Sequence, residues 1–383
     1  MGTELYIGIM SGTSLDGIDI VVARFSERVE CLAHESVAFP AALRDLLYEA
    51  ATAEEINIDT YSRLHFLLAE RYADAVAQTL AKHKLTPSGI RAIGLHGQTV
   101  RHIPAKAAIT SDTSAIGATI QLGSGSALAA LTGIDVVSDF RSADVALGGQ
   151  GAPLVPMFDV AFLRSNTTRI ALNIGGIANL TIIPATGLSV PVRAYDTGPG
   201  NMIIDELARI YFSKPFDDGG AIAASAQASE ALLDELLAHE YFTTEPPKST
   251  GRELFGSYFL SQFLTRIDAG MLTAADAIRT ATELTARSIA NEAARYTELY
   301  THGLEIIGSG GGVRNTFLMK RLGELIPAAV ILSSDEIGIA AQAKEALAFA
   351  FFAKAYLEET VIHLPETTGA SRAVLLGSLS RGK

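Results

Sequence analysis

Glycine-rich turns and single polar residues recur along the chain at positions where they can hold phosphate groups or a metal. The first such segment is Gly8-Ile-Met-Ser-Gly-Thr-Ser-Leu-Asp-Gly17. Its small residues let the backbone approach an anion, its hydroxyls can donate hydrogen bonds, and Asp16 can hold a divalent metal directly or through water. No Gly-Lys-Ser/Thr follows, which excludes a Walker A loop. Taken alone, the segment is explained equally well as a hairpin turn.

The second segment is Asn173-Ile-Gly-Gly-Ile-Ala-Asn179, directly after the mainly apolar strand pattern at residues 169–172. Adjacent glycines between β-branched residues indicate a sharp turn or a close backbone approach. Asn173 and Asn179 can bind phosphate oxygens or metal-bound water. A tight hairpin with asparagine caps explains the same residues by conformation alone.

The third segment is Ala194-Tyr-Asp-Thr-Gly-Pro-Gly-Asn201, which leads into a helical pattern at residues 202–211. An aspartate at the end of a strand, before a turn and a helix, lies where a general base or a metal-binding carboxylate belongs in an α/β protein. Asp196 can instead cap the backbone N–H groups of the following turn, which aspartate does often. Both interpretations stay open on the residues alone.

The fourth segment is Ile306-Ile-Gly-Ser-Gly-Gly-Gly-Val-Arg-Asn315, before a helical pattern at residues 316–325. Three glycines after a buried strand leave a flat backbone for a base or ribose, and the helix N-terminus favours anionic groups. A bulky residue at Gly310 is therefore expected to weaken nucleotide binding and leave the fold intact. A dinucleotide-binding motif fits poorly, because it belongs in an early βαβ unit with an acidic residue roughly 20 positions on.

Polar residues also follow apolar strands at residues 96–99, 139–144 and 148–153. Histidine, glutamine, arginine and carboxylate groups in such loops suit the hydroxyls, amide and carboxylate of a polar substrate. Any single one of these residues is more often structural. Four other histidines, which lie in helical or loop stretches without a partnering motif, are expected to be structural or solvated: His65, His83, His102 and His363.

Alternating strands and helices must position these segments. Hydrophobic patterns predict strands at 4–10, 18–25, 29–39, 92–96, 134–140, 169–174, 178–183 and 304–309. They predict helices at 64–80, 202–211, 316–325 and about 338–359, the last as a buried or cleft-lining helix instead of a membrane span. This alternation indicates an α/β protein with mixed sheets. Apolar strands enter glycine-rich turns at both 7–17 and 171–180, which suggests two related lobes.

Composition narrows the class of protein. A chain of 383 residues exceeds what one core usually organises, so two domains with a cleft are expected. The formal net charge of −12 argues against nucleic acid as a partner. The single cysteine, Cys31, excludes an internal disulfide. This cysteine usage, and an N-terminal sequence without the pattern of a secretory signal, predict a cytoplasmic protein.

In this order, the motifs resemble the ATPase domain shared by actin, sugar kinases and 70-kDa heat-shock chaperones. The residue sequences of these motifs resemble, more specifically, the anhydro-N-acetylmuramic acid kinase family over nearly the whole chain. The resemblance implies a two-lobed actin-like, ribonuclease H-like α/β fold with a central cleft. Residues 1–168 and 169–383 would form the lobes, with the last helix packing back on the first. The segments that carry the resemblance are 8–19, 96–99, 139–153, 173–179, 196–201 and 308–315.

The resemblance also implies roles for single residues. The first ATP phosphate loop would contain Gly12, Thr13, Ser14, Leu15, Asp16, Gly17, Ile18 and Asp19. The second phosphate loop would contain Asn173, Gly175, Gly176 and Asn179, and the adenosine shelf Gly308, Gly310, Gly311 and Gly312. Asp196 would be the catalytic base. The substrate residues would be His96, Gln98, Arg141, Asp196 and Glu345, although a solvated helix position explains Glu345 equally well.

The family's reaction opens the 1,6-anhydro ring of the amino sugar with water and transfers the γ-phosphoryl group of ATP to O6. The products are N-acetylmuramic acid 6-phosphate and ADP, in cell-wall recycling. One carboxylate serves this chemistry by deprotonating water at C1, so that O6 leaves as the nucleophile toward phosphorus. Because the motifs hold few basic residues, Mg²⁺ is expected as a cofactor, with Asp16 as a candidate ligand.

Two other functions are compatible with the same motifs. Another sugar or acid kinase of the same fold is the nearest alternative, and a chaperone-like nucleotide-dependent binder is a more distant one. The expected partners are ATP and a small amino sugar, without nucleic acid or membrane, and a homodimer is a candidate assembly. The segment 242–251, with Pro246, Pro247 and Lys248, is a candidate for a mobile loop that closes over substrate.

Overall fold

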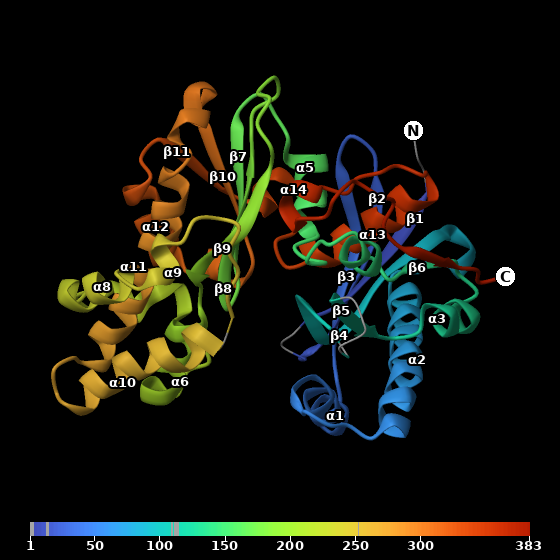
Figure 1. Cartoon of the computed structure of the whole chain (residues 1–383), viewed down its shortest axis with the longest axis horizontal. Coiled ribbons are helices and arrows are strands. Elements are labelled where there is room, and N and C mark those ends of the chain that lie inside the picture. Colours follow the sequence, from blue (N-terminus) through green and yellow to red (C-terminus); the bar gives the residue numbers. More distant parts are fainter. Residues whose placement is uncertain (1–3, 13–14, 109, 111–114, 252) are drawn as a thin grey trace. The chain divides into compact units, whose positions relative to one another are not determined.

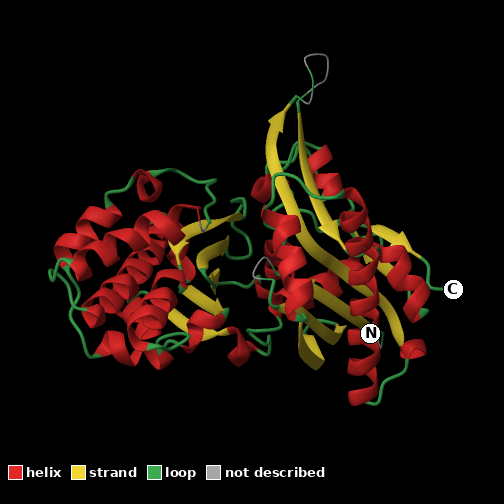
Figure 2. Ribbon diagram, turned by 90° about the horizontal axis from the view of Figure 1, so that it is seen from below, coloured by secondary structure: helices red, strands yellow, loops and turns green. Residues whose placement is uncertain are grey.

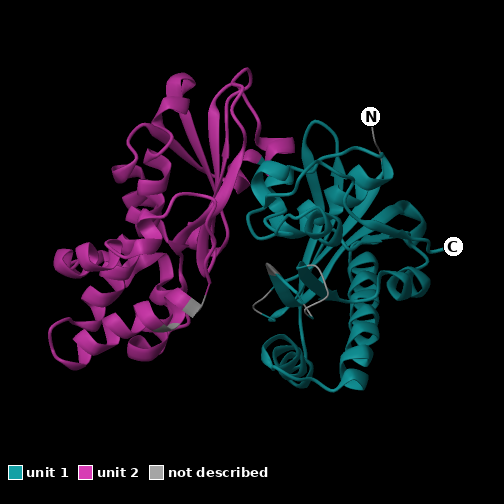
Figure 3. Cartoon of the chain, in the orientation of Figure 1, with its two compact units in different colours: residues 1–158, 338–383 teal, residues 159–337 magenta. Residues whose placement is uncertain are grey.

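The computed structural model describes residues 4–12, 15–108, 110, 115–251 and 253–383. Contacts divide the chain into unit 1, residues 1–158 with 338–383, and unit 2, residues 159–337 (Figure 3). This division differs from the expected boundary after residue 168. The observed boundary, after residue 158, lies inside helix α5 (Val155–Leu163). The ring of Phe158 in this helix packs against that of Phe351 in unit 1, with 6.1 Å between the ring centroids.

Unit 1 is a mixed sheet with helices. Its strand order is β12-β6-β4-β1-β2-β3, with β5 paired to β4, and β1 is antiparallel to β2 but parallel to β4. The long β4–β5 hairpin extends beyond the rest of the sheet (Figure 2). The strands are β1 (Leu5–Ser11), β2 (Gly17–Phe25), β3 (Val29–Ala38), β4 (Ile90–Ala107), β5 (Ile116–Leu122), β6 (Val136–Ser138) and β12 (Ser378–Ser380). The helices are α1 (Ala41–Thr52), α2 (Ile58–Lys82), α3 (Gly125–Thr132), α4 (Ser142–Ala146), α13 (Lys344–Leu357) and α14 (Pro365–Thr368).

Helix α13 crosses strands β1 and β4 at very short range (Figure 1). A Cβ atom built at Gly8 would lie 1.8 Å from the carbonyl oxygen of Ala346, and one at Gly94 would lie 1.8 Å from that of Phe349. Only glycine therefore allows this helix to lie on the sheet. The expected start of the helix near residue 338 is wrong, because Gly338 has a φ of +82° and the helix begins at Lys344.

Unit 2 is a second mixed sheet, with strand order β11-β10-β7-β8-β9. Its strands are β7 (Thr168–Ile174), β8 (Ile177–Ile183), β9 (Arg193–Pro199), β10 (Leu304–Ser309) and β11 (Ala329–Ser333). Its helices are α6 (Met202–Phe212), α7 (Ala221–Ala224), α8 (Glu230–Leu237), α9 (Glu240–Thr243), α10 (Leu260–Asp268), α11 (Ala274–Ala294) and α12 (Thr316–Leu325). Helices α11 and α12 cover one face of the sheet and form a core with Leu172, Leu180 and Tyr195 (Figure 1).

The predicted strands and helices agree well with these elements, and the expected α/β class with mixed sheets is confirmed. Strands β5, β11 and β12 and the long extension of β4 were not predicted, and neither were the bounds of several helices, among them α1, α8, α10 and α11. In the part of the chain that the structure describes, no helix is both long and apolar enough to cross a membrane.

Candidate active site

A row of polar residues crosses the sheet of unit 2. Strand register pairs Ser309 of β10 with Asn173 of β7, Asn173 with Asn179 of β8, and Asn179 with Asp196 of β9. Directly paired residues share a face of a sheet, and their chain neighbours Leu172, Leu180 and Tyr195 lie in the core on the other face. The row therefore lies on the face away from that core. Three motifs that are separate in the sequence meet in it.

The turn between β7 and β8 consists of Gly175 and Gly176. Their carbonyl groups accept hydrogen bonds from the N–H groups of Asn201, at 2.8 Å, and Gly200, at 2.9 Å. Gly200 must be glycine, because its Cβ would lie 2.2 Å from the oxygen of Gly175. Gly176, in contrast, is exposed, and its Cβ would meet nothing closer than Met202 at 3.8 Å. The turn thus presents open backbone to which an anion can come close.

The glycines at the end of β10 and directly after it differ in how much space surrounds them. Gly310 has a φ of +81°, and its Cβ would lie 2.5 Å from Oδ1 of Asn173. A Cβ at Gly312 would lie 2.3 Å from the side chain of Ile174, and one at Gly308 would lie 2.9 Å from Val313. These three glycines allow tight packing, so the expectation that a bulky residue at Gly310 leaves the fold intact is wrong.

Gly311 alone among the four predicted shelf residues is exposed to solvent and open. Its Cβ would meet only Asn201 Nδ2, at 3.9 Å. It begins a short 3₁₀ segment, Gly311–Arg314, before helix α12. The next residue, Asn315, caps α12, since its Oδ1 accepts the N–H of Leu318 at 2.9 Å.

Asp196 lies within strand β9 and not at its end, because the strand continues to Pro199. Its side chain is partly buried, and Oδ2 accepts the N–H of Thr250 at 2.9 Å. That donor comes from the segment 242–251 and not from the turn that follows Asp196. In the same segment, the buried Lys248 forms a 2.7 Å ion pair with Glu292 of α11. Closure of this segment over substrate stays a prediction.

In unit 1, Arg141 binds a buried histidine. Its Nε and Nη2 atoms lie 3.1 and 2.7 Å from Nε2 of His96, and Nη1 donates to the carbonyl oxygen of Gly151. Burial and the Arg141 charge hold the pKa of His96 well below its usual range. His96 is therefore neutral, and because Nε2 accepts, its proton lies on Nδ1. Burial lowers the pKa of Arg141 to about 10, against the effect of Glu345, so it stays charged near pH 7.

Glu345 lies in the first turn of α13, near Arg141. Its side chain reaches solvent, although protein surrounds its carboxyl group densely. This burial, and the negative charge of Asp19, raise the pKa of Glu345, while Arg141 and Lys344 act in the opposite direction. A carboxyl group with a raised pKa and access to water is typical of functional sites.

Polar side chains and the hydrophobic core of unit 1 hold the first glycine-rich loop, at residues 12–19, in place. Gln98 is fully buried and donates from Nε2 to the carbonyl oxygen of Gly12 at 3.0 Å, while Ser11 bonds to Tyr72 at 2.6 Å. Leu15 and Ile18 lie in the hydrophobic core, so their side chains anchor the loop.

The other predicted residues of this loop differ in exposure. Asp16 is exposed and Asp19 is partly buried. A Cβ at Gly17 would lie 2.3 Å from the oxygen of Val37, so this glycine lets two strands approach. Thr13 and Ser14 lie outside the residues that the structure describes.

The sequence reasoning missed a buried network around Asp144. Its carboxylate accepts from the N–H of Gly151 at 2.6 Å and bonds to Nε2 of His363 at 2.6 Å and to Thr368. The network fixes the loop that carries Arg141. No local pattern could have found it, because Asp144 and His363 are 219 positions apart.

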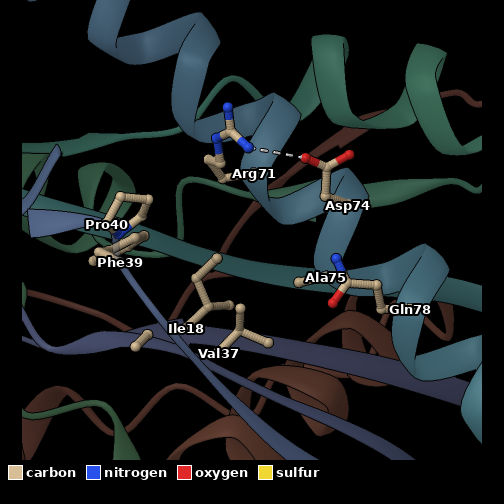
Figure 4. A pocket seen from close by; sticks show the side chains of 9 residues that line it. Ile18, Val37, Phe39, Pro40, Arg71, Asp74, Ala75 and Gln78 are labelled. Carbon is tan, nitrogen blue, oxygen red and sulfur yellow. Dashed lines mark hydrogen bonds and ion pairs between the residues drawn. The ribbon is translucent and has the colours of Figure 1, made fainter.

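A hollow in unit 1 lies between β2, β3 and α2, and Figure 4 shows its lining. The only predicted site residue in it is Ile18, and its charged residues Arg71 and Asp74 already form an ion pair at 3.3 Å. It offers no reactive group. Among the described residues, no three or more His, Cys, Asp or Glu side chains are grouped so as to hold a metal.

Comparison with known proteins gives a consistent result. The family model described as anhydro-N-acetylmuramic acid kinase matches residues 4–382. A Vibrio parahaemolyticus protein with that name is 40% identical over 378 residues, which cover 98% of each chain. A Salinibacter ruber protein with that name is 42% identical over 98% of this chain and 95% of its own.

A solved structure supports the fold class. The ligand-bound xylulose kinase from Lactobacillus acidophilus superposes with a TM-score of 0.50 at 11% identity. The superposition covers 98% of this chain and 93% of the other.

Proposed function

Because the chain belongs to the anhydro-N-acetylmuramic acid kinase family, we propose that it opens the 1,6-anhydro ring of anhydro-N-acetylmuramic acid and phosphorylates O6 with ATP. The products are N-acetylmuramic acid 6-phosphate and ADP. The observation that carries this proposal is the family match over residues 4–382. The polar row that ends in Asp196 supplies a carboxylate for the chemistry.

Asp196 acts as the general base. Its carboxylate takes a proton from a water molecule as the water oxygen forms a bond to C1 of the sugar. The bond between C1 and O6 breaks, O6 keeps the electron pair, and it attacks the γ-phosphorus while ADP leaves. The N–H of Thr250, 2.9 Å from Oδ2, fixes the orientation of the carboxylate during this step.

The nucleotide binds largely through backbone groups. The open turn at Gly175 and Gly176, with the amide side chains of Asn173 and Asn179, suits phosphate oxygens. Gly311 provides accessible backbone for the adenosine. The loop at residues 12–19 is the other phosphate-binding segment, and there the backbone of Gly12 is fixed by Gln98.

The donor set fits Mg²⁺ that is held mainly by the nucleotide. Mg²⁺ takes one or two carboxylates together with phosphate oxygens and water, and the exposed Asp16 offers such a carboxylate. A cage made of protein side chains alone is absent from the described residues. When bound, the ion would neutralise charge on the phosphates.

The sugar binds to the polar residues of unit 1. Arg141 makes three hydrogen bonds to His96 and Gly151, which fix its guanidinium group and leave other N–H groups for a ligand. The Oε1 atom of Gln98 is buried without a hydrogen-bond partner among the described residues. These groups, with Glu345, match the hydroxyls, amide and carboxylate of an amino sugar.

A coupled assay of ADP release tests the function. We expect ADP release to require anhydro-N-acetylmuramic acid, and the product mass to equal the sugar plus one water and one phosphoryl group. Glucose, xylulose and N-acetylmuramic acid are the comparison substrates. The proposal would be rejected by an equal rate of ADP release with one of these sugars, or by ATP hydrolysis at a rate that does not depend on the anhydro sugar. Cytoplasmic location and a homodimer stay predictions, which fractionation and light scattering can test.

A further inference from the structure

Lys248 is a charged residue that the proposed reaction does not use, although it is almost completely buried. Its side chain is 4% exposed, and its Nζ lies 2.7 Å from Oε1 of Glu292, which is 2% exposed. Nζ also donates to the carbonyl oxygen of Tyr241 at 3.0 Å and lies 4.8 Å from the centre of its ring. A buried ion pair adds little net stability, because desolvation of both charges offsets their attraction. Net stability therefore does not explain why Lys248 and Glu292 are buried together.

The chain on either side of Lys248 holds Asp196 at three points. The N–H of Asp196 donates to the carbonyl oxygen of Lys248 at 3.2 Å, and the N–H of Thr250 donates to Oδ2 of Asp196 at 2.9 Å. The hydroxyl of Tyr241 donates to the carbonyl oxygen of Asp196 at 2.8 Å. Among the described residues, strand β9 is at the edge of its sheet, so no further strand supplies these bonds. Residues 241–250, which we call the strap, take the place of that strand at Asp196.

Charged residues of helix α11 and of its C-terminal end lie next to the strap. Burial, and then the charges of Asp196 and Glu292, raise the pKa of Tyr241, so its hydroxyl keeps the proton that it donates. Glu292 is also paired with Arg295, at 2.9 Å from Nε to Oε2. Lys248 thus forms the buried ion pair between the strap and helix α11. Arg295, which caps the end of α11, forms a second, more exposed ion pair with the strap, at 2.6 Å from Nη1 to Oε1 of Glu245.

We propose that Lys248 is a positioning residue for the reaction, acting on Asp196 through the strap and not by contact with the substrate. The ion pair with Glu292 sets where the Thr250 N–H and the Tyr241 hydroxyl lie. Those two donors set the position and the orientation of the carboxylate. This inference rests on the proposed role of Asp196 as the base. Displacement of a reacting group by about 1 Å can lower a rate by roughly 10²-fold.

The test compares two variants that each remove one cation from a buried glutamate of α11. Lys248→Met leaves Glu292 paired with Arg295, and the control Arg321→Met leaves Glu283 paired with Arg279 at 3.2 Å. We expect Lys248→Met to lower kcat by about 10-fold or more with KM for ATP nearly unchanged. Arg321→Met should keep kcat, whatever its effect on thermal stability. Equal kcat for folded Lys248→Met and Arg321→Met would overturn the inference.

Two further variants keep the test decisive. If Lys248→Met fails to fold, Tyr241→Phe removes only the hydroxyl that binds Asp196 and should lower kcat by about fivefold, as one hydrogen bond predicts. A wild-type kcat in Tyr241→Phe would then overturn the inference. Asp196→Asn is measured in parallel. If it alone is inactive, the strap inference fails and the base stands; if it is fully active, the assignment of the base itself fails.

Discussion

The two units hold their candidate site residues by different physical means. In unit 2, glycine turns and neutral amides form the site, and Asp196 is the one carboxylate in the row. In unit 1, the buried His96 and the partly buried Arg141 lie near Glu345, and the pKa of each of these three groups is shifted. Backbone groups suit any phosphate, whereas fixed charges distinguish one polar substrate from another. We therefore expect changes in unit 2 to affect the nucleotide and the chemical step, and changes in unit 1 to affect the sugar.

The largest effect is expected from Asp196→Asn, which makes the polar row of unit 2 entirely neutral. An asparagine oxygen can still accept the N–H of Thr250, so the fold should persist while the proton acceptor is lost. We predict that kcat falls by roughly 10²-fold or more with little change in KM for ATP. Steady-state kinetics measures this, with Asp205→Asn as a control carboxylate in the same unit. A near-wild-type kcat would mean that Asp196 is not the base.

A smaller effect, confined to the sugar, is expected from Arg141→Met in unit 1. Loss of charge-assisted hydrogen bonds should raise KM for the anhydro sugar by about 10- to 100-fold and leave KM for ATP unchanged. The control is Arg24→Met, which removes an ion pair with Glu30 at the surface of the same unit. If KM for ATP rises as much as KM for the sugar, the division of labour between the units is wrong.

The third prediction separates two neighbouring glycines of unit 2. Gly311→Val places its side chain in open space, so it should fold normally and raise KM for ATP by about fivefold through contact with the nucleotide. Gly310→Val should instead destabilise the protein, because its φ is +81° and its Cβ would lie 2.5 Å from Asn173. Thermal melting and nucleotide titration measure the two effects. Unchanged ATP affinity in Gly311→Val would remove the adenosine assignment.

The smallest effect concerns the dependence of stability on pH at Glu345. Because its pKa is raised in the folded protein, its contribution to stability is full below the ordinary glutamate pKa and is lost as pH rises through the raised value. The melting temperature of Glu345→Gln relative to the wild type should therefore rise from pH 4 to pH 7. We expect a change below about 2 °C, because the side chain is open to solvent. A difference in melting temperature that stays constant or falls between pH 4 and pH 7 would contradict the raised pKa of Glu345.

Residues close together in the sequence were the predictable ones. The pattern at residues 304–325 gave strand β10, the glycine turn and helix α12 almost to the residue. The polar row was not predictable, because it depends on register across four strands and on the irregularity between Ala178 and Asn179. Lys248 lies in a proline-containing segment without periodicity, so only the fold reveals that it is buried against α11.

In the proposed reaction, water opens the sugar ring at C1 while O6 receives the phosphoryl group. This step is tested most directly by a reaction in H₂¹⁸O that is quenched within the first turnovers, before the C1 hydroxyl exchanges with solvent. We expect one ¹⁸O atom at C1 of the sugar phosphate and none in the phosphoryl group. An ¹⁸O atom in the phosphoryl group, or an unlabelled C1, would contradict it.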